Sequence, residues 1–241
     1  MTDMRLKIPV SGESSSWGPD DPHIPKPHLL AKAITEHLDL DDATKHEVDF
    51  FADRLMDKIE SALMYYQLIM ADDFAARNIS QQRTIYEGLY ANLWSFYKGR
   101  VQNFIKKMGW NIAVFFCREA NFEKEAQKFI ASNPGHEAII EFARKQREAW
   151  QTAFGRNRDI AEHSGDYRGI TDLYETPADA RRLFAQVCQT AETLIAHFGS
   201  YKMEKNWNVI EVKPGATIFD RDDRHIVEHV VMTAQRNKKH A

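Results

Sequence analysis

The chain has 241 residues, of which 43% are hydrophobic and 28% charged, and its formal net charge is −3. This length fits one large domain or two small ones, and the apolar content can build a sizeable core. The near balance of charge excludes a globally basic nucleic-acid-binding surface, so any contact with RNA has to come from a local patch.

Residues 1–27 are rich in proline and serine, which predicts an extended arm, disordered or laid over the domain, because proline lacks a backbone donor. A helical domain over 28–200 is expected to follow, beginning with a short helix over 28–38. A C-terminal extension over 201–241 completes the predicted organisation.

Two long helices are expected next. Asp41 or Asp42 can cap the first, which runs to about Arg77, because its apolar residues recur at steps of three and four. Ser80 is expected to cap the second, which Gly109 ends.

Aromatic residues widen the apolar stripe of this second helix. Tyr86, Tyr90, Trp94 and Tyr97 recur at steps of three or four. Such a stripe indicates a core or a dimer interface, and a platform on which nucleobases stack is the alternative.

The segment 111–116 is a short apolar run that periodicity assigns neither to a strand nor to a helix. Asn121 is expected to cap a helix that ends near Ser132, and another apolar-periodic helix is predicted from about His136 to Phe154. Thr176 with Pro177 is typical of a helix start, and Gly199 is expected to end that helix.

The last part of the chain changes character. The stretch 207–212 and the stretch 216–219, separated by a Pro-Gly turn, predict a small β-hairpin, and a final helix is expected from about Asp222. The fold class predicted for the whole chain is therefore all-α, a multi-helix up-and-down bundle with a small C-terminal hairpin-plus-helix extension.

The most distinctive stretch lies between two of the predicted helices and reads Phe-Gly-Arg-Asn-Arg-Asp-Ile-Ala-Glu-His-Ser-Gly-Asp-Tyr-Arg-Gly over 154–169. Arginine presents a permanently charged fork of donors suited to phosphate oxygens, and histidine can exchange a proton near neutral pH. Together, Arg156, Arg158 and His163 could transfer a phosphoryl group without a metal ion or another cofactor.

This stretch resembles the signature of HEPN domains, in which a polar residue follows an arginine and a histidine comes four to six residues later. Both Arg158 and Arg156, the latter followed by Asn157, have this spacing to His163. The resemblance covers roughly residues 41–199. It implies an all-helical, usually dimeric, metal-independent endoribonuclease, of a kind that commonly acts in toxin-antitoxin or antiviral defence, with a neutralising antitoxin protein as a possible partner.

In this interpretation His163 takes a proton from an RNA 2′-hydroxyl, and Arg158 or Arg156 stabilises the charge that develops on the phosphate. If the segment is helical, Arg156 shares a face with His163, whereas Arg158 lies about 140° away; a non-helical start would reverse this preference. Asn157 could orient the substrate or cap a helix, and Arg168 is a further candidate for substrate binding.

A local basic patch over 144–168 could supply the contact with RNA, although the run 144–148 also fits a solvated helix face. The main alternative function is a non-catalytic helical module that binds a protein or a nucleotide. The overall acidity of the chain and Glu162, beside the expected base, favour that alternative.

A second histidine motif lies near the C-terminus. His225 and His229, with Glu228 between them, match the inverted zincin pattern, but no Asp, Glu or Cys follows as a third ligand, so no metal site is predicted. Arg224 and His229 also have the HEPN spacing, without a core helix after them.

The expected compartment is the cytoplasm. Cys117 and Cys188 lie among apolar residues, which indicates reduced, buried thiols. The first ten residues contain no apolar run typical of a signal peptide, and no segment is long enough to cross a bilayer.

Overall fold

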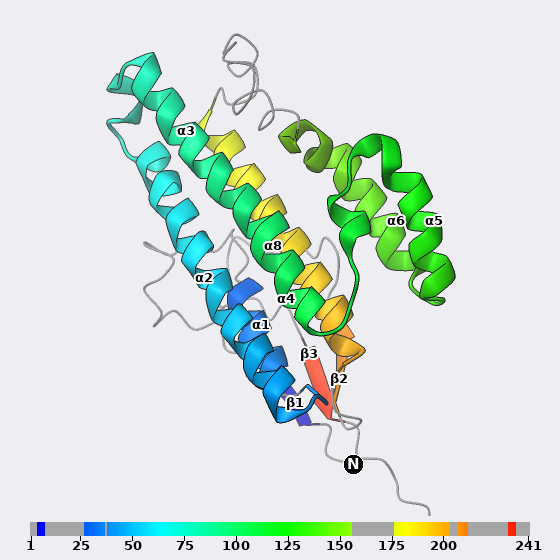
Figure 1. Ribbon diagram of the computed structural model, residues 1–241. Coiled ribbons are helices and arrows are strands. Elements are labelled where there is room, and N and C mark those ends of the chain that lie inside the picture. The colour runs from blue at the N-terminus through cyan, green and yellow to red at the C-terminus, as the bar shows by residue number, and fades with distance from the viewer. Residues whose placement is uncertain are drawn as a thin grey trace, which may run out of the picture.

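The computed structural model describes residues 4–7, 27–36, 38–155, 176–202, 207–211 and 231–234. Most of these residues are helical, which confirms the predicted all-α class. Long helices form an elongated bundle, and the pair α5 and α6 lies along one side of it (Figure 1). Among the described helices, none is both long and apolar enough to span a membrane.

The first two helices form as the sequence predicts, with small differences in length. Helix α1 spans Pro27–Glu36. Helix α2 spans Asp42–Met70, and the Asp41 side chain accepts a hydrogen bond from the Thr44 backbone N–H. It ends earlier than the predicted Arg77, because Ala71 is extended and Phe74 folds inward in a 3₁₀ turn, η2 (Phe74–Ala76), where its ring contacts Tyr86.

The second long helix is assembled from three segments. Helix α3 (Ile79–Trp94) passes into a π-helical segment, η3 (Ser95–Val101), and then into α4 (Gln102–Lys107). The prediction of Ser80 as the cap is wrong. Asn78 caps the helix instead, because its side chain and that of Gln81 each accept a hydrogen bond from the other's backbone N–H.

The open assignment of 111–116 is resolved as a buried 3₁₀ turn, η4 (Ala113–Phe116). After it come η5 (Glu119–Asn121), α5 (Phe122–Ser132), α6 (Glu137–Gln146) and a π-helical segment, η6 (Arg147–Gln151), with helical residues continuing to Gly155. Asn121 does precede α5, but its side chain makes no capping bond. The helices α5 and α6 form an antiparallel pair, which we call the α5–α6 hairpin.

Helix α8 (Pro177–Ser200) is the central helix of the fold. It contacts α1, α2, α3, α4 and α6, and Figure 1 shows it running behind α3 and α4. Its predicted start is confirmed: Thr176 accepts a hydrogen bond from the Asp179 backbone N–H, and Pro177 is the first helical residue. Every described residue over 190–199 except His197 is buried, so polar side chains there must find partners inside the protein.

Three short strands form an antiparallel sheet in the order β1-β3-β2 near the end of α8 (Figure 1). Strand β2 (Trp207–Glu211) lies where a strand is predicted, but its partner is β3 (Val231–Ala234), which also pairs with β1 (Met4–Lys7). The predicted final helix is therefore wrong over 231–234, because pairing on both sides overrides the local helical pattern. The predicted hairpin partner, 216–219, lies outside the described residues.

Close packing of α1 against α8 leads to a test of the core. A Cβ atom added at Gly199 would lie 2.8 Å from Cγ2 and 3.1 Å from Cδ1 of Ile34, which is fully buried and has no room to move. We expect Gly199→Ala to lower the free energy of unfolding by about 1–3 kcal/mol, as overpacking usually does. Chemical denaturation monitored by circular dichroism measures the change.

Gly99→Ala is the matched control. Its added Cβ would meet only the Ser95 hydroxyl, at an ordinary 3.7 Å. Since alanine favours helix over glycine, this variant should be neutral or up to about 1 kcal/mol more stable. Equal effects of the two substitutions would show that the α1–α8 contact does not limit the core.

Candidate functional site: the ends of the Arg/His segment

The residues proposed for catalysis and substrate binding, Arg156, Asn157, Arg158, His163 and Arg168, all lie outside the described residues, as does the motif at 225–229. The structure does describe the two points at which the chain enters and leaves this part. We call residues 156–175 the Arg/His segment, and its two described ends are Gly155 and Thr176.

An aromatic cluster lies next to Gly155, where the chain enters the Arg/His segment; we call this point the entry. The Phe154 ring is buried and lies 5.1 Å from the ring of Tyr90, 5.3 Å from Trp94 and 5.7 Å from Trp150, measured between centroids. Gly155 follows directly beside Trp94. Aromatic contacts of this geometry are stabilising beyond simple burial, so the chain enters the Arg/His segment from a fixed point.

Thr176, where the chain leaves the Arg/His segment, caps α8; we call this point the exit. The Thr176 hydroxyl donates to the Asp179 carboxylate at 2.9 Å, which reinforces the cap. One turn further, the Arg181 Nε donates to the Tyr66 hydroxyl at 3.0 Å, and the Phe184 ring contacts the Tyr66 ring at 5.5 Å. These contacts attach the start of α8 to α2.

Both ends of the Arg/His segment lie along one face of α3. The entry contacts Tyr90 and Trp94, while Asp179 at the exit is close enough to Tyr86 that, after burial, it helps to raise the pKa of that phenol. These three aromatic residues are spaced by four, and Tyr86 and Trp94 are about 12 Å apart along the helix axis. The predicted aromatic stripe is thus mostly core, and Tyr90 and Trp94 in it contact Phe154 at the entry of the Arg/His segment.

Two arginines in the first part of the expected basic patch are engaged within the protein. Arg147 is buried and donates from Nε to Glu119 at 3.1 Å and from an Nη to the Cys117 carbonyl at 2.9 Å, with its guanidinium over the Phe122 ring. Arg144 donates to both Glu123 oxygens at 3.0 Å and also to Glu141. Arg144 therefore fits the interpretation of this run as a solvated helix face. Arg147 fits neither that interpretation nor a contact with RNA, because it is buried.

One exposed side chain near the entry, Lys98, is not singled out by the sequence. The Lys98 ammonium lies 5.6 Å from the centroid of the Trp94 ring, one helical turn further along the chain. An i, i+4 pair of this kind is visible in the sequence, but only the structure shows that it adjoins Gly155. Lys98 therefore places a positive charge near Trp94, which lies beside Gly155, the last described residue before the Arg/His segment.

Sequence reasoning also misses a partly buried histidine pair. His136 precedes α6 and His197 lies in the last turn of α8, and the His136 Nδ1 and His197 Nε2 atoms are 2.9 Å apart, a hydrogen bond. The sequence suggests a structural or surface role for each alone. Their 61-residue separation leaves no local signal of a contact.

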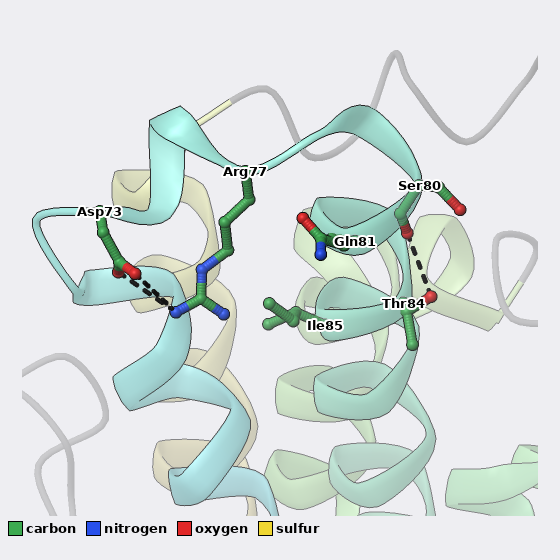
Figure 2. Close-up of a pocket in the computed structure, with 6 residues that line it drawn as sticks. All are labelled: Asp73, Arg77, Ser80, Gln81, Thr84 and Ile85. Carbon is green, nitrogen blue, oxygen red and sulfur yellow. Dashed lines mark hydrogen bonds and ion pairs between the residues drawn. The ribbon is translucent and has the colours of Figure 1, made fainter.

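An open hollow of about 500 Å³ lies at the turn between α2 and α3 (Figure 2). It is lined by Asp73, Arg77, Ser80, Gln81, Thr84 and Ile85. Asp73 accepts two hydrogen bonds from Arg77, and the Thr84 hydroxyl is occupied by the Ser80 carbonyl. Its one cation, Arg77, is paired with Asp73, and its lining contains no histidine or cysteine.

Neither described thiol is activated. Burial raises the pKa of Cys117, and it raises that of Cys188 well above the ordinary value, so both remain protonated at neutral pH. Within the described ranges, no group of three or more His, Cys, Asp or Glu side chains is placed to hold a metal ion. No protein-family model, curated protein or solved structure matches the sequence significantly.

Proposed function

We propose that the protein is a metal-independent endoribonuclease of the HEPN type, active as a homodimer, and that the Arg/His segment carries its active site. The observation that carries the proposal is the way in which the chain is held on either side of this segment. Two arginines and a histidine with the HEPN spacing occur in a stretch that follows Phe154, which packs on α3, and precedes α8, whose start is attached to Tyr66 of α2. A site held on rigid elements keeps its reacting groups in place.

In the proposed reaction His163 accepts the proton of an RNA 2′-hydroxyl, and the oxygen attacks the adjacent phosphorus atom. Arg158 or Arg156 stabilises the charge on the non-bridging oxygens. The bond to the 5′-oxygen breaks, and this oxygen takes a proton from an acid, a role that His163 of the second subunit can fill. The products are a 2′,3′-cyclic phosphate and a 5′-hydroxyl end.

Two features near the entry support this proposal. Lys98 supplies a positive charge over the ring of Trp94, which also lies beside Gly155, and an RNA backbone could approach there. The two π-helical segments, η3 and η6, meet there through the rings of Tyr97 and Trp150, 5.3 Å apart. Such π-helical turns are frequent at functional sites.

A helical module that binds a protein, an antitoxin or a nucleotide without catalysis is the second candidate. The engagement of Arg144 and Arg147 within the protein favours it, because these cations are occupied by Glu123, Glu141 and Glu119 and are not offered to phosphate. Under the first proposal, RNA contacts must come from the Arg/His segment and its immediate surroundings.

Chelation and removal of the 2′-hydroxyl test the proposed chemistry. We expect the protein to cleave mixed-sequence RNA in EDTA at the same rate as with Mg²⁺, and to leave the corresponding DNA intact, since DNA has no 2′-hydroxyl. Gel electrophoresis of end-labelled strands measures both. Cleavage that EDTA abolishes would contradict the proposal, and absence of any cleavage would favour the binding module.

A further inference from the structure

The pair of His136, which is buried, and His197, which is partly buried, joins the α5–α6 hairpin to the central helix. His136 stands at the boundary from which α6 begins, and His197 lies on α8. The hairpin lies to one side of the bundle in Figure 1. A hydrogen bond at this position therefore fixes one element of the fold to another.

Aromatic rings surround the pair. The His136 ring lies 4.3 Å from Tyr201, 5.1 Å from Trp110 and 6.1 Å from Phe129, measured between centroids. His136 is only 5% exposed. Water therefore has little access to stabilise a charge on His136.

Two charged groups lie near the pair. Glu137 on α6 favours the charged form of His136, and the Lys202 ammonium after α8 lies over the Trp110 ring at 5.3 Å. The carboxylate of Glu137 opposes the effect of burial on His136 without cancelling it. His197 has no such carboxylate among the causes of its shift; burial and then His136 disfavour its charged form.

The geometry limits how many protons the pair can hold. With one proton between the facing nitrogens, one ring donates and the other accepts. Protonation of both rings removes the acceptor and places two N–H groups and two like charges 2.9 Å apart. The doubly protonated pair cannot keep this contact.

We propose that the His136–His197 pair is an acid-sensitive latch, whose protonation releases the α5–α6 hairpin from α8 while the bundle of α1, α2, α3 and α8 stays folded. This inference does not depend on the proposed nuclease activity. The hairpin is the element that responds, because α6 is held on α8 where these two side chains meet.

The lowered pKa values of His136 and His197 determine how the stability of the latch depends on pH. Burial lowers the pKa of His136, and burial together with His136 lowers the pKa of His197 to about 4. The closed form therefore binds fewer protons than the open form, in which a histidine titrates near 6.5. The latch is fully formed above pH 6.5 and weakens as the pH falls toward 4.

Hydrogen exchange at pH 7.5 and 5.0, expressed as protection factors, tests the latch. With a pKa of about 4 when closed and about 6.5 when open, titration of His197 alone should increase the opening equilibrium about thirtyfold between these two conditions. We expect the protection of residues 122–146 to fall by that factor, while the amides of α2 change little. An unchanged hairpin, or an equal loss in α2, would overturn the proposal.

His197→Gln is the decisive variant, because a glutamine amide can donate to or accept from His136 without titrating. It should abolish the response of the hairpin, and the exposed control His46→Gln should keep it. If His197→Gln lowers the protection of the whole protein, the variant no longer isolates the latch. In that case NMR titration of the wild-type histidines, which measures their pKa values directly, is the test. A pKa at or above 6.5 for both His136 and His197 would then overturn the latch.

Discussion

Replacement of His163 by alanine is expected to reduce RNA cleavage by about 10²–10⁴-fold, the usual contribution of a general base. The loss should appear in kcat, because the imidazole acts on the 2′-hydroxyl in the transition state and contributes little to RNA binding. Single-turnover cleavage of a labelled RNA at saturating protein measures the change, beside RNA affinity by fluorescence anisotropy.

The control for this variant is His46→Ala, since His46 is exposed on α2, away from the ends of the Arg/His segment. It should cleave like the wild type. Matched thermal unfolding of both variants excludes a loss of fold. Arg156→Ala and Arg158→Ala distinguish the two arginines: the one that stabilises the phosphate charge should cost about 10²–10³-fold. Full activity of His163→Ala would remove the proposed base.

Replacement of Glu119 by alanine is expected to destabilise the fold by about 3 kcal/mol, because it leaves the buried guanidinium of Arg147 without its counterion. The Arg147 side chain is 5% exposed, and one of its Nη atoms already lacks a hydrogen-bond partner. The same substitution also removes the acceptor for the Thr152 hydroxyl. Urea denaturation followed by circular dichroism measures the free energy.

Glu123→Ala is the matched control, because Glu123 is as exposed as Glu119, 62% against 61%, and also pairs with an arginine. Its partner Arg144 is 37% exposed, so water can solvate the guanidinium once the carboxylate is gone. The free energy of unfolding should therefore fall by only about 0.2–1 kcal/mol. The double variant with Glu119→Ala and Arg147→Met should be more stable than Glu119→Ala alone. Equal losses for the two glutamates would show that the burial of Arg147 has no energetic consequence.

Much of the helical framework could be predicted from the sequence, because its signals are local. Asp41 and Thr176 cap helices where expected, and Gly109 ends α4 with a φ of +90° that favours glycine. The cap at Asn78 was missed in favour of Ser80, since both are good capping residues two positions apart and only the backbone bonds distinguish them.

What could not be predicted depends on contacts between distant parts of the chain. Strand β3 forms because β1 and β2 pair with it from both sides, more than 200 and at least 20 residues away. Arg147 is buried because Glu119 and the Cys117 carbonyl, 28 and 30 residues away, meet its donors. For the candidate site, the sequence predicts the residues and the flanking helices, whereas the packing of the entry on α3 and of the exit on α2 follows only from tertiary contacts.

The chemistry of the cleaved ends tests the central claim most directly. The wild-type protein, incubated with RNA in EDTA, should produce fragments that carry a 2′,3′-cyclic phosphate at one end and a 5′-hydroxyl at the other, as identified by mass spectrometry. His163→Ala should not produce them. Fragments with 5′-phosphate and 3′-hydroxyl ends would contradict attack by the 2′-hydroxyl, and with it the assignment of the Arg/His segment as a metal-independent ribonuclease site.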